Sequence, residues 1–119
     1  MTLAALIIEV EQPEGLSARK LVLETAKHNV LTAYNGADGV ELLRRFPKVD
    51  VVIAHIEVRD IPFNRLVRMV KEIRPDVRIV ALSPDGAGDI GDADFVVPSH
   101  EPQKLMQLLK EEFGASDTN

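Results

Sequence analysis

The chain has 119 residues, of which 45% are hydrophobic and 28% are charged, and this composition is typical of a single globular domain. The absence of cysteine excludes disulfides, thiolate metal sites and cysteine catalysis, and the net charge of −5 argues against a nucleic-acid or anionic-membrane partner, since both need clustered lysine and arginine. The longest apolar run, Leu3–Val10, is too short to span a membrane and follows no basic segment of the signal-peptide type, so we expect a cytoplasmic protein.

Apolar runs alternate with segments of helical periodicity, which is the pattern of an α/β domain with a parallel sheet. The first strand is predicted over Leu3–Ile8, where a continuous apolar run is typical of a strand buried on both faces. A helix is predicted over Leu16–Asn29 from its apolar stripe. A second strand is predicted over Val30–Tyr34, and its partial alternation favours a position at the edge of the sheet.

The same alternation continues through the middle of the chain. A helix is predicted over Ala37–Phe46, with Phe46 facing the core, and a third strand over Val49–Ile56. The next helix is expected to begin near Pro62, where the missing N–H of proline costs nothing, and to end before Pro75.

The last third of the chain departs from this pattern in one connection. Strands are predicted over Val77–Leu82 and Phe95–Val97, and a final helix over Pro102–Phe113 with Gly114 as its C-cap. The segment between these two strands, residues 84–94, contains three glycines and four aspartates, which are poor formers of helix interiors. We therefore expect a loop, or at most one helical turn, in place of the fourth helix.

These elements predict an α/β, flavodoxin-like fold with a five-stranded parallel sheet in the order 2-1-3-4-5 and helices on both faces. One domain is expected over residues 1–114, followed by a flexible tail over residues 115–119. Function in such sheets lies at the carboxyl ends of the strands. Four segments are expected there: Glu9–Gln12, Ala54–Asp60, Ser83–Asp85 and Val97–His100.

Several short segments, in order and at fitting spacing, resemble the receiver domains of two-component response regulators. Leu31–Gly36 followed by Gly39–Leu43 is similar to the second strand and helix of that family. Asp50–Ala54 resembles the strand before the phosphoacceptor, Ile79–Ser83 the strand that ends in the switch hydroxyl, and Ala93–Val97 the approach to the family lysine. The resemblance covers nearly the whole chain and implies the receiver fold and a role in phosphorelay signal transduction.

The resemblance also implies that the usual phosphorylation chemistry is missing. The family places two acids after strand 1, an aspartate after strand 3, a serine or threonine after strand 4 and a lysine after strand 5. The acids hold Mg²⁺, which shields the aspartate and the phosphoryl group. Here His55 takes the position of the phosphoacceptor and is not expected to be phosphorylated, Ser83 and Phe95 take the switch positions, and Pro98 takes the position of the lysine.

Acidic residues remain near the predicted carboxyl edge of the sheet. Strand alternation would place Glu9 and Glu11 on one face, and with Glu57 and Asp60 they could form a weak site for a divalent cation such as Mg²⁺, which we do not expect to be occupied. A solvated acidic rim is the simpler interpretation. Gly86–Gly91 matches the dinucleotide pattern G-x-G-x-x-G, but a strand follows it where the motif requires a helix, so no nucleotide or other cofactor is expected.

Two classes of function remain open. The first is an atypical receiver that acts as a protein–protein interaction module without aspartyl phosphorylation, with a kinase, a regulator or an output domain as partner. We expect it to be a monomer or weak homodimer, and expect the missing fourth helix to expose Phe95. The alternative is a small-ligand or divalent-metal-binding flavodoxin-like domain that uses the crevice at the carboxyl ends. Enzymatic activity is not expected, because no neighbour is positioned by the sequence to activate Ser83.

Overall fold

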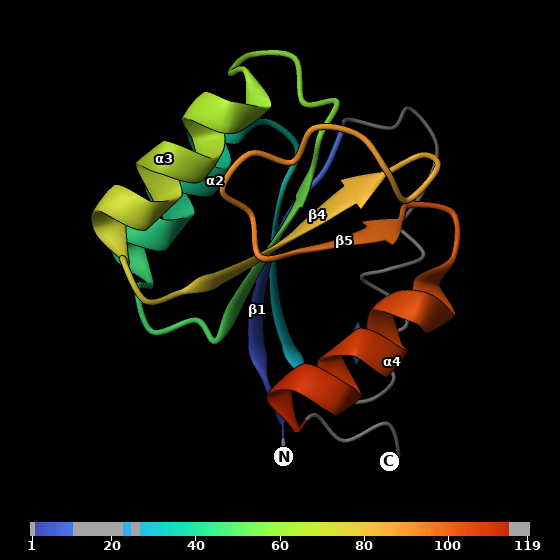
Figure 1. Cartoon of the computed structure of the whole chain (residues 1–119). Helices are drawn as coiled ribbons and strands as arrows, with labels where there is room; N and C mark the ends of the chain where they lie inside the picture. Colours follow the sequence, from blue (N-terminus) through green and yellow to red (C-terminus); the bar gives the residue numbers. More distant parts are fainter. Residues whose placement is uncertain (1, 11–22, 25–26, 115–119) are drawn as a thin grey trace.

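The computed structural model describes residues 2–10, 23–24 and 27–114. Most of the predicted first helix and the whole predicted tail lie outside the described residues. The elements and their bounds, shown in Figure 1, are β1 (Ala4–Ile8), β2 (Asn29–Ala33), α2 (Gly36–Arg45), β3 (Val51–His55), α3 (Phe63–Ile73), β4 (Arg78–Ser83), β5 (Phe95–Pro98) and α4 (Pro102–Phe113).

The strands form one parallel sheet in the order β2-β1-β3-β4-β5, as predicted. Leu6 in β1 is in register with Leu31 in β2 and with Val52 in β3. The strand β2 lies at one edge of the sheet, in agreement with its partial alternation. All carboxyl ends therefore meet along one side of the sheet, which places the loops that follow β1, β3, β4 and β5 close together.

Helices cover both faces of the sheet (Figure 1): α2 and α3 lie on one side and α4 on the other. Successive strand residues point to opposite faces, so Leu6 and Ile8 join the core under α2 and α3 while Ile7 joins the core under α4. Leu66 from α3 and Leu109 from α4 are fully buried on their respective sides. This two-sided burial explains why the central strands are apolar throughout.

The end of α2 corrects one prediction from the sequence. The apolar spacing predicted that Phe46 faces the core, but this residue is 51% exposed. The helix ends at Arg45, and Phe46 is its C-cap, with a non-helical backbone and an N–H that donates to the carbonyl of Leu42 at 2.8 Å. Because Pro47 follows and cannot continue the helix, the periodicity no longer sets the direction of the Phe46 side chain.

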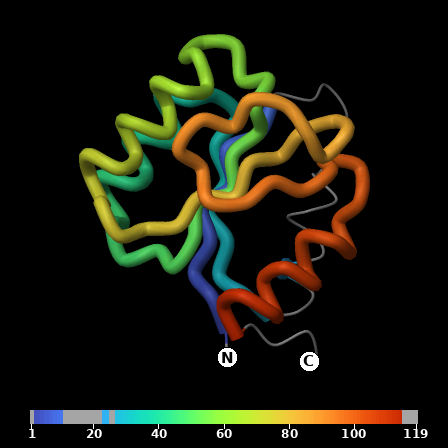
Figure 2. The backbone as a smooth tube through the Cα atoms, in the orientation of Figure 1, coloured from blue at the N-terminus to red at the C-terminus, as the bar shows by residue number. Residues whose placement is uncertain are grey.

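The connection between β4 and β5 contains no helix over residues 84–94, as predicted. It runs beside the first turn of α3 (Figure 2), where a Cβ on Gly91 would lie 3.7 Å from the Cβ of Asn64. Asp94 fixes the far end of the loop, because its carboxylate accepts hydrogen bonds from the N–H of Ile79 at 2.8 Å and from Lys71 at 3.1 Å. The end of the loop is thus bonded to β4 and to α3, directly before β5 begins.

The helix α4 has the predicted bounds, Pro102–Phe113, with Pro102 in its first turn. Gly114 is its C-cap in the left-handed conformation, with a φ of 65°, as predicted. Among residues 2–10, 23–24 and 27–114, no helix has both the length and the apolar character needed to cross a bilayer.

Candidate functional site

Buried polar side chains locate the site, because a polar group is rarely buried without a structural or functional reason. Within the described part of the chain, the buried polar residues are Glu9, His28, His55, Ser83 and Ser99. All of these except His28 end or directly follow β1, β3, β4 and β5. They therefore gather along the side of the sheet formed by the carboxyl ends of the strands, where the sequence predicts function.

His55 ends β3 and is only 8% exposed. Its ring Nδ1 accepts a hydrogen bond from the backbone N–H of Glu57 at 3.1 Å, so the neutral ring carries its proton on Nε2. That second nitrogen lies 3.9 Å from a carboxylate oxygen of Glu57. The turn after β3 thus fixes the orientation of the ring, and an imidazole with one engaged nitrogen stands at the end of the central strand.

Ser83 ends β4 and is held by its own loop. Its hydroxyl lies 2.8 Å from Oδ1 of Asp85 and 2.5 Å from the carbonyl oxygen of Ala87, and the residue is 1% exposed. The same carboxylate oxygen of Asp85 accepts a hydrogen bond from the N–H of Ala87 at 3.0 Å. These bonds from the Ser83 hydroxyl and the Ala87 N–H lower the pKa of Asp85. The hydroxyl is thus already bound to a carboxylate within the loop.

Pro98 ends β5 next to Ser83, its partner in the sheet register. The loop after β4 packs on its ring: Gly86 has a φ of 72°, and a Cβ there would lie 2.9 Å from Cγ of Pro98. The carbonyl oxygen of Ser83 accepts hydrogen bonds from the N–H groups of Gly86 at 3.2 Å and Ser99 at 2.7 Å. The loop and the end of β5 therefore form one tightly packed unit, with an apolar contact at Pro98.

Phe95 is partly buried, so the expectation that it would be exposed is wrong. Its ring packs edge-on against Phe113 of α4, with centroids 6.1 Å apart and an angle of 63°. The guanidinium of Arg78 lies 3.9 Å from the centroid of Phe113 and 5.8 Å from that of Phe95. Arg78 also donates to the carbonyl oxygen of Glu112 at 2.8 Å. The helix α4 and Arg78 thus cover the ring on the side away from the missing helix.

The acidic residues predicted as weak metal ligands differ in their surroundings. Glu9 is 1% exposed, whereas the side chain of Glu57 is 61% exposed, and Glu11 lies outside the described residues. Both carboxylate oxygens of Asp60 instead accept hydrogen bonds from the first turn of α2, from the N–H groups of Gly36 at 2.8 Å and Ala37 at 2.9 Å. Burial raises the pKa of Asp60, but these bonds lower it below its usual value overall.

Hard cations such as Mg²⁺ need several oxygen ligands around one point. No group of three or more acidic or histidine side chains in the described ranges could hold a metal ion. The described residues therefore do not fit the Mg²⁺ site that the receiver resemblance implies. The weak site with Glu11 remains a prediction.

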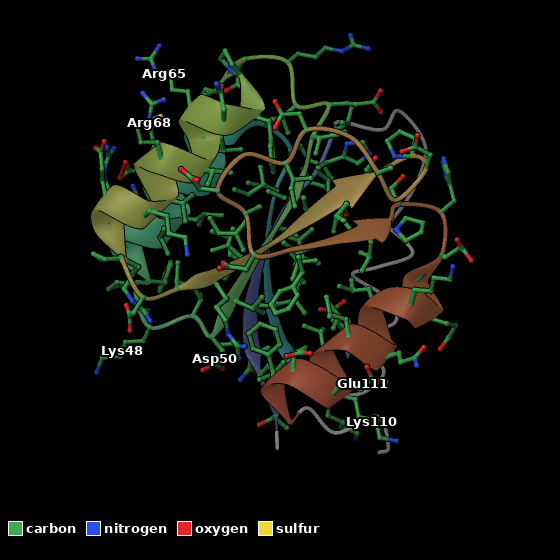
Figure 3. All side chains as sticks on the ribbon, viewed as in Figure 1. Lys48, Asp50, Arg65, Arg68, Lys110 and Glu111 are labelled. Atoms are coloured by element: carbon green, nitrogen blue, oxygen red, sulfur yellow. The ribbon has the colours of Figure 1, made fainter. Side chains whose placement is uncertain are left out.

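The charged side chains of α3 lie apart from this site. Arg65 and Arg68 point away from the sheet (Figure 3), as expected for solvated helix charges. At the amino ends of the strands, Asp50 accepts a hydrogen bond from the N–H of Ala4 at 2.8 Å and links the start of β1 to the start of β3. Asp50 thus supports the frame of the sheet at the end opposite to the carboxyl-end cluster.

Sequence reasoning placed His55, Ser83 and Pro98 at strand ends but did not identify Asp85 as the partner of Ser83. The segment Ser83-Pro84-Asp85-Gly86 has the residue types of a tight turn, in which an aspartate side chain bonds back to the chain. That signal could have predicted the contact. The capping role of Asp60 had no such local signal, because Asp60 and Gly36 are 24 residues apart in the sequence.

At the level of sequence, no protein-family model matches the chain and no curated protein does. Solved structures do match. A CheY-like response regulator receiver domain from Methanospirillum hungatei has a TM-score of 0.75 at 18% identity, over 96% of this chain and 95% of its own. The receiver domain of a sensor histidine kinase from Pseudomonas aeruginosa, with magnesium in its active-site cleft, has a TM-score of 0.82 at 14% identity, over 96% and 99%.

A third match is the CheX–CheY–BeF₃–Mg²⁺ complex of Borrelia burgdorferi, with a TM-score of 0.76 at 17% identity, over 93% of this chain and 89% of the matched chain. All three likenesses extend over nearly the whole length of both chains. The chain therefore has the CheY-like receiver fold that its sequence segments resemble, with the predicted strand order.

Proposed function

We propose that the chain is an atypical receiver domain of two-component (phosphorelay) signalling, which acts as a protein–protein interaction module without aspartyl phosphorylation. The observation that carries the proposal is the set of side chains at the carboxyl ends of β3, β4 and β5. His55 places an imidazole at the end of β3. Ser83 places a hydroxyl that is already bound to a carboxylate at the end of β4, and Pro98 places its ring at the end of β5.

The end of β3 lacks the group that an aspartyl phosphate requires. His55 has no carboxylate, and the lone pair of its Nδ1 accepts the N–H of Glu57. In that tautomer Nε2 is protonated, so neither nitrogen offers a free lone pair for attack on phosphorus. The carboxylate of Glu57, 3.9 Å from Nε2, would in addition repel an incoming phosphoryl group.

The ends of β4 and β5 lack the groups that would respond to a phosphoryl group. A charged lysine stabilises phosphoryl oxygens by a charge-assisted hydrogen bond, and a proline ring cannot do so. The hydroxyl of Ser83 would first have to leave Asp85 and Ala87. Since Gly86 packs on Pro98, that movement would also disturb the end of β5. These contacts favour one fixed conformation over a switch.

A fixed receiver fold can act by binding. One of the similar solved structures is a complex of a receiver with a second protein, CheX. By analogy, we take the partner of this chain to be a signalling protein: a kinase, a regulator or an output domain. In this proposal the module works in the cytoplasm, catalyses no reaction of its own and requires no cofactor.

Intact-mass measurement after incubation with Mg²⁺ and acetyl phosphate tests the proposal. We expect no gain of mass, and we expect the same for the His55→Ala variant. The matched variant His55→Asp with Pro98→Lys restores the carboxylate and the lysine, and a phosphoryl adduct on that variant alone would show that these two positions block the chemistry. A gain of one phosphoryl group by the unmodified chain, lost in His55→Ala, would contradict the proposal.

The binding half of the proposal has its own test. Affinity capture from the native host, with the intact chain as bait, is expected to recover a histidine kinase, a response regulator or an output domain. Recovery of none of these classes counts against a signalling role, whatever the outcome of the phosphorylation experiment.

A further inference from the structure

The strand β2 has one side that pairs with β1 and one side that is open. The N–H of Asn29 donates to the carbonyl oxygen of Leu3 at 2.9 Å, and the carbonyl oxygen of Ala33 accepts from Glu9 at 2.8 Å. Since the direction of these groups alternates along a strand, the N–H and C=O groups of Val30 and Thr32 point away from β1. Within the described part of the chain, no strand pairs with that side.

This edge lacks the features by which proteins usually protect an open strand. Edge strands commonly carry charged residues, proline or a bulge. The strand β2 reads Asn-Val-Leu-Thr-Ala, with no charge and no proline, and its side chains from Val30 to Thr32 are partly exposed. The opposite edge strand, β5, contains Pro98, which has no N–H to offer. Among residues 2–10, 23–24 and 27–114, one of the two sheet edges is thus left open for pairing.

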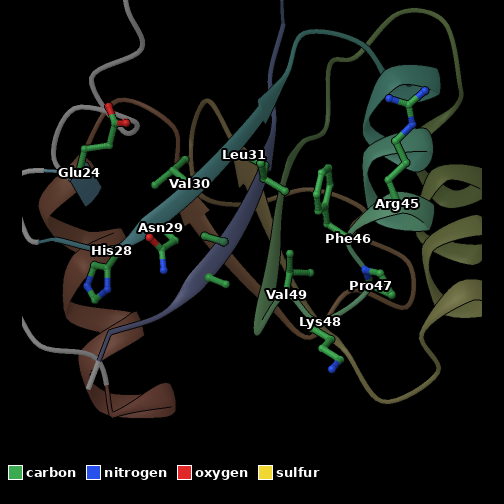
Figure 4. Close-up of a pocket in the computed structure, with 12 residues that line it drawn as sticks. Glu24, His28, Asn29, Val30, Leu31, Arg45, Phe46, Pro47, Lys48 and Val49 are labelled. Atoms are coloured by element: carbon green, nitrogen blue, oxygen red, sulfur yellow. The ribbon is translucent and has the colours of Figure 1, made fainter.

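Exposed aromatic side chains flank the same edge. Tyr34, 38% exposed, and Phe46, 51% exposed, are the exposed large hydrophobic residues of the described ranges. Tyr34 directly follows β2. Phe46 lines a groove of about 740 Å³ together with Val30 and Leu31, and Figure 4 shows it beside Leu31. Apolar surface therefore borders β2 at both of its ends.

The charges along this edge change sign from one end to the other. The hollow at the Tyr34 end is lined by Asp38 and Glu41 together with Arg45, so acidic groups are in excess there. The groove at the Phe46 end is lined by Arg45 and Lys48 together with Glu24, so basic groups are in excess. Glu41 also pairs with Arg45 along α2 at 3.6 Å, but both side chains are more than half exposed, so that pair is weak and leaves both groups accessible. A surface with an acidic and a basic end is complementary to itself when turned by half a rotation.

We propose that the open edge of β2 binds a second copy of this chain, with the two β2 strands antiparallel about a two-fold axis at Leu31. In this register Val30 of each copy faces Thr32 of the other, and each such pair exchanges two backbone hydrogen bonds. The Leu31 side chains meet at the axis, beside Phe46, and the acidic end of each edge meets the basic end of the other. The inference does not depend on the proposed signalling function.

The proposed interface is small, so the dimer is expected to be weak. Stable interfaces bury about 1,600 Å² in total, and a pair of five-residue strands with two flanking aromatic rings offers less. Sedimentation velocity should therefore show monomer at low concentration and a reversible dimer as the concentration approaches the millimolar range.

The variant Val30→Pro tests the backbone pairing. The N–H of Val30 points away from β1, so its loss leaves the sheet intact but removes a donor from the proposed interface. We expect Val30→Pro to stay monomeric at concentrations where the unmodified chain and the control Val30→Ile dimerise. Circular dichroism of the monomers checks that all three chains fold.

Charge reversal tests the register without changing the strand. Glu41→Lys or Arg45→Glu alone places like charges opposite one another twice in a symmetric dimer, and each should raise the dissociation constant about tenfold. The double variant restores both the opposite charges across the interface and the pair within α2, so it should dimerise like the unmodified chain.

Amide hydrogen exchange supplies the direct readout. The amides of Val30 and Thr32 should exchange more slowly at high than at low protein concentration, while amides of α3 should not change. A chain that stays monomeric up to millimolar concentration overturns the proposal. So does a dimer that tolerates Val30→Pro and leaves these two amides unprotected, because that dimer uses another surface.

Discussion

At the scale of single residues, the carboxyl-end cluster is organised by short-range contacts that the turns impose. His55 is oriented by the turn that follows it, and Ser83 by an aspartate two residues later. Asp60 bonds from the loop after β3 to the N-terminus of α2. These contacts hold the side chains of His55, Ser83 and Asp60 in fixed orientations.

Asp60 gives a prediction about stability and pH. Its carboxylate satisfies two N–H groups of the first turn of α2, so Asp60→Ala should lower the free energy of unfolding by about 1 kcal/mol at neutral pH. Because the folded-state pKa lies below the unfolded value, this stabilisation is present above about pH 4 and is lost as the pH falls through the folded pKa. Urea denaturation of the unmodified chain and of Asp60→Ala from neutral pH to pH 2 measures this stabilisation. If the difference in unfolding free energy between the two chains were unchanged at pH 2, the Asp60 carboxylate would not be its source.

Gly86 and Gly88 allow the cost of an added methyl group to be compared at a packed and at an open position of the same loop. Both have a positive φ, 72° and 109°, so alanine strains the backbone at either position. Only at Gly86 would the added Cβ also meet the ring of Pro98, whereas nothing lies within 4 Å at Gly88. Gly86→Ala should therefore destabilise the chain by about 1 kcal/mol more than Gly88→Ala. Equal losses in denaturation experiments would show that the loop does not pack on Pro98.

At the scale of elements, the helix α4 covers Phe95 from its own face of the sheet. Phe113 packs on Phe95, and the guanidinium of Arg78 lies over the ring of Phe113 while it donates to the end of the helix. The last turn of α4 is thereby held against the start of β4, and the partly buried position of Phe95 follows from this contact.

Arg78 is therefore expected to stabilise the end of α4. Arg78→Ala should cost about 1–2 kcal/mol, from the lost cation–π contact and the lost hydrogen bond to Glu112. Arg78→Lys should recover only part of this, because an ammonium does not match the planar stacking of a guanidinium. Faster amide exchange confined to the last turn of α4 would support the account, and unchanged exchange in Arg78→Ala would count against it.

The elements also show which features sequence patterns can predict. The bounds of α4 were predicted from Pro102 and Gly114, because both residues act through their own backbone. The absence of a helix over residues 84–94 was predicted from composition, because glycine and aspartate disfavour helix interiors. The direction of the Phe46 side chain was not predicted correctly, because apolar spacing does not show at which residue a helix ends. The cover over Phe95 depends on Phe113, 18 positions away, and no local pattern contains it.

At the scale of the whole molecule, two features lie on two different sides of the sheet, one at the carboxyl ends of the strands and one along the β2 edge. The strand ends carry a cluster whose hydrogen bonds are largely internal, and the β2 edge carries open backbone groups. The strand order was predicted as the usual arrangement of five parallel strands in a doubly wound sheet, whereas the pairing of side chains within the cluster required the three-dimensional structure.

The alternative of a ligand-binding domain gives a prediction at this scale. A ligand that binds only the folded chain raises its melting temperature. In a thermal-shift panel of Mg²⁺, nucleotides and flavins, we expect no stabilisation beyond that produced by sodium chloride of equal ionic strength, because the acids of the described residues do not form a cation site. Stabilisation by several degrees with one member of the panel would favour the ligand-binding alternative.

The most direct test of the central claim, that this receiver fold does not respond to a phosphodonor, is the amide NMR spectrum of the labelled chain with Mg²⁺ before and after addition of acetyl phosphate. The amides of His55, Glu57, Ser83 and Phe95 report on the ends of β3 and β4 and on β5. None of these amide signals is expected to move. A coordinated shift of these amides, with a rise in mass by one phosphoryl group, would contradict the claim and would identify a working switch.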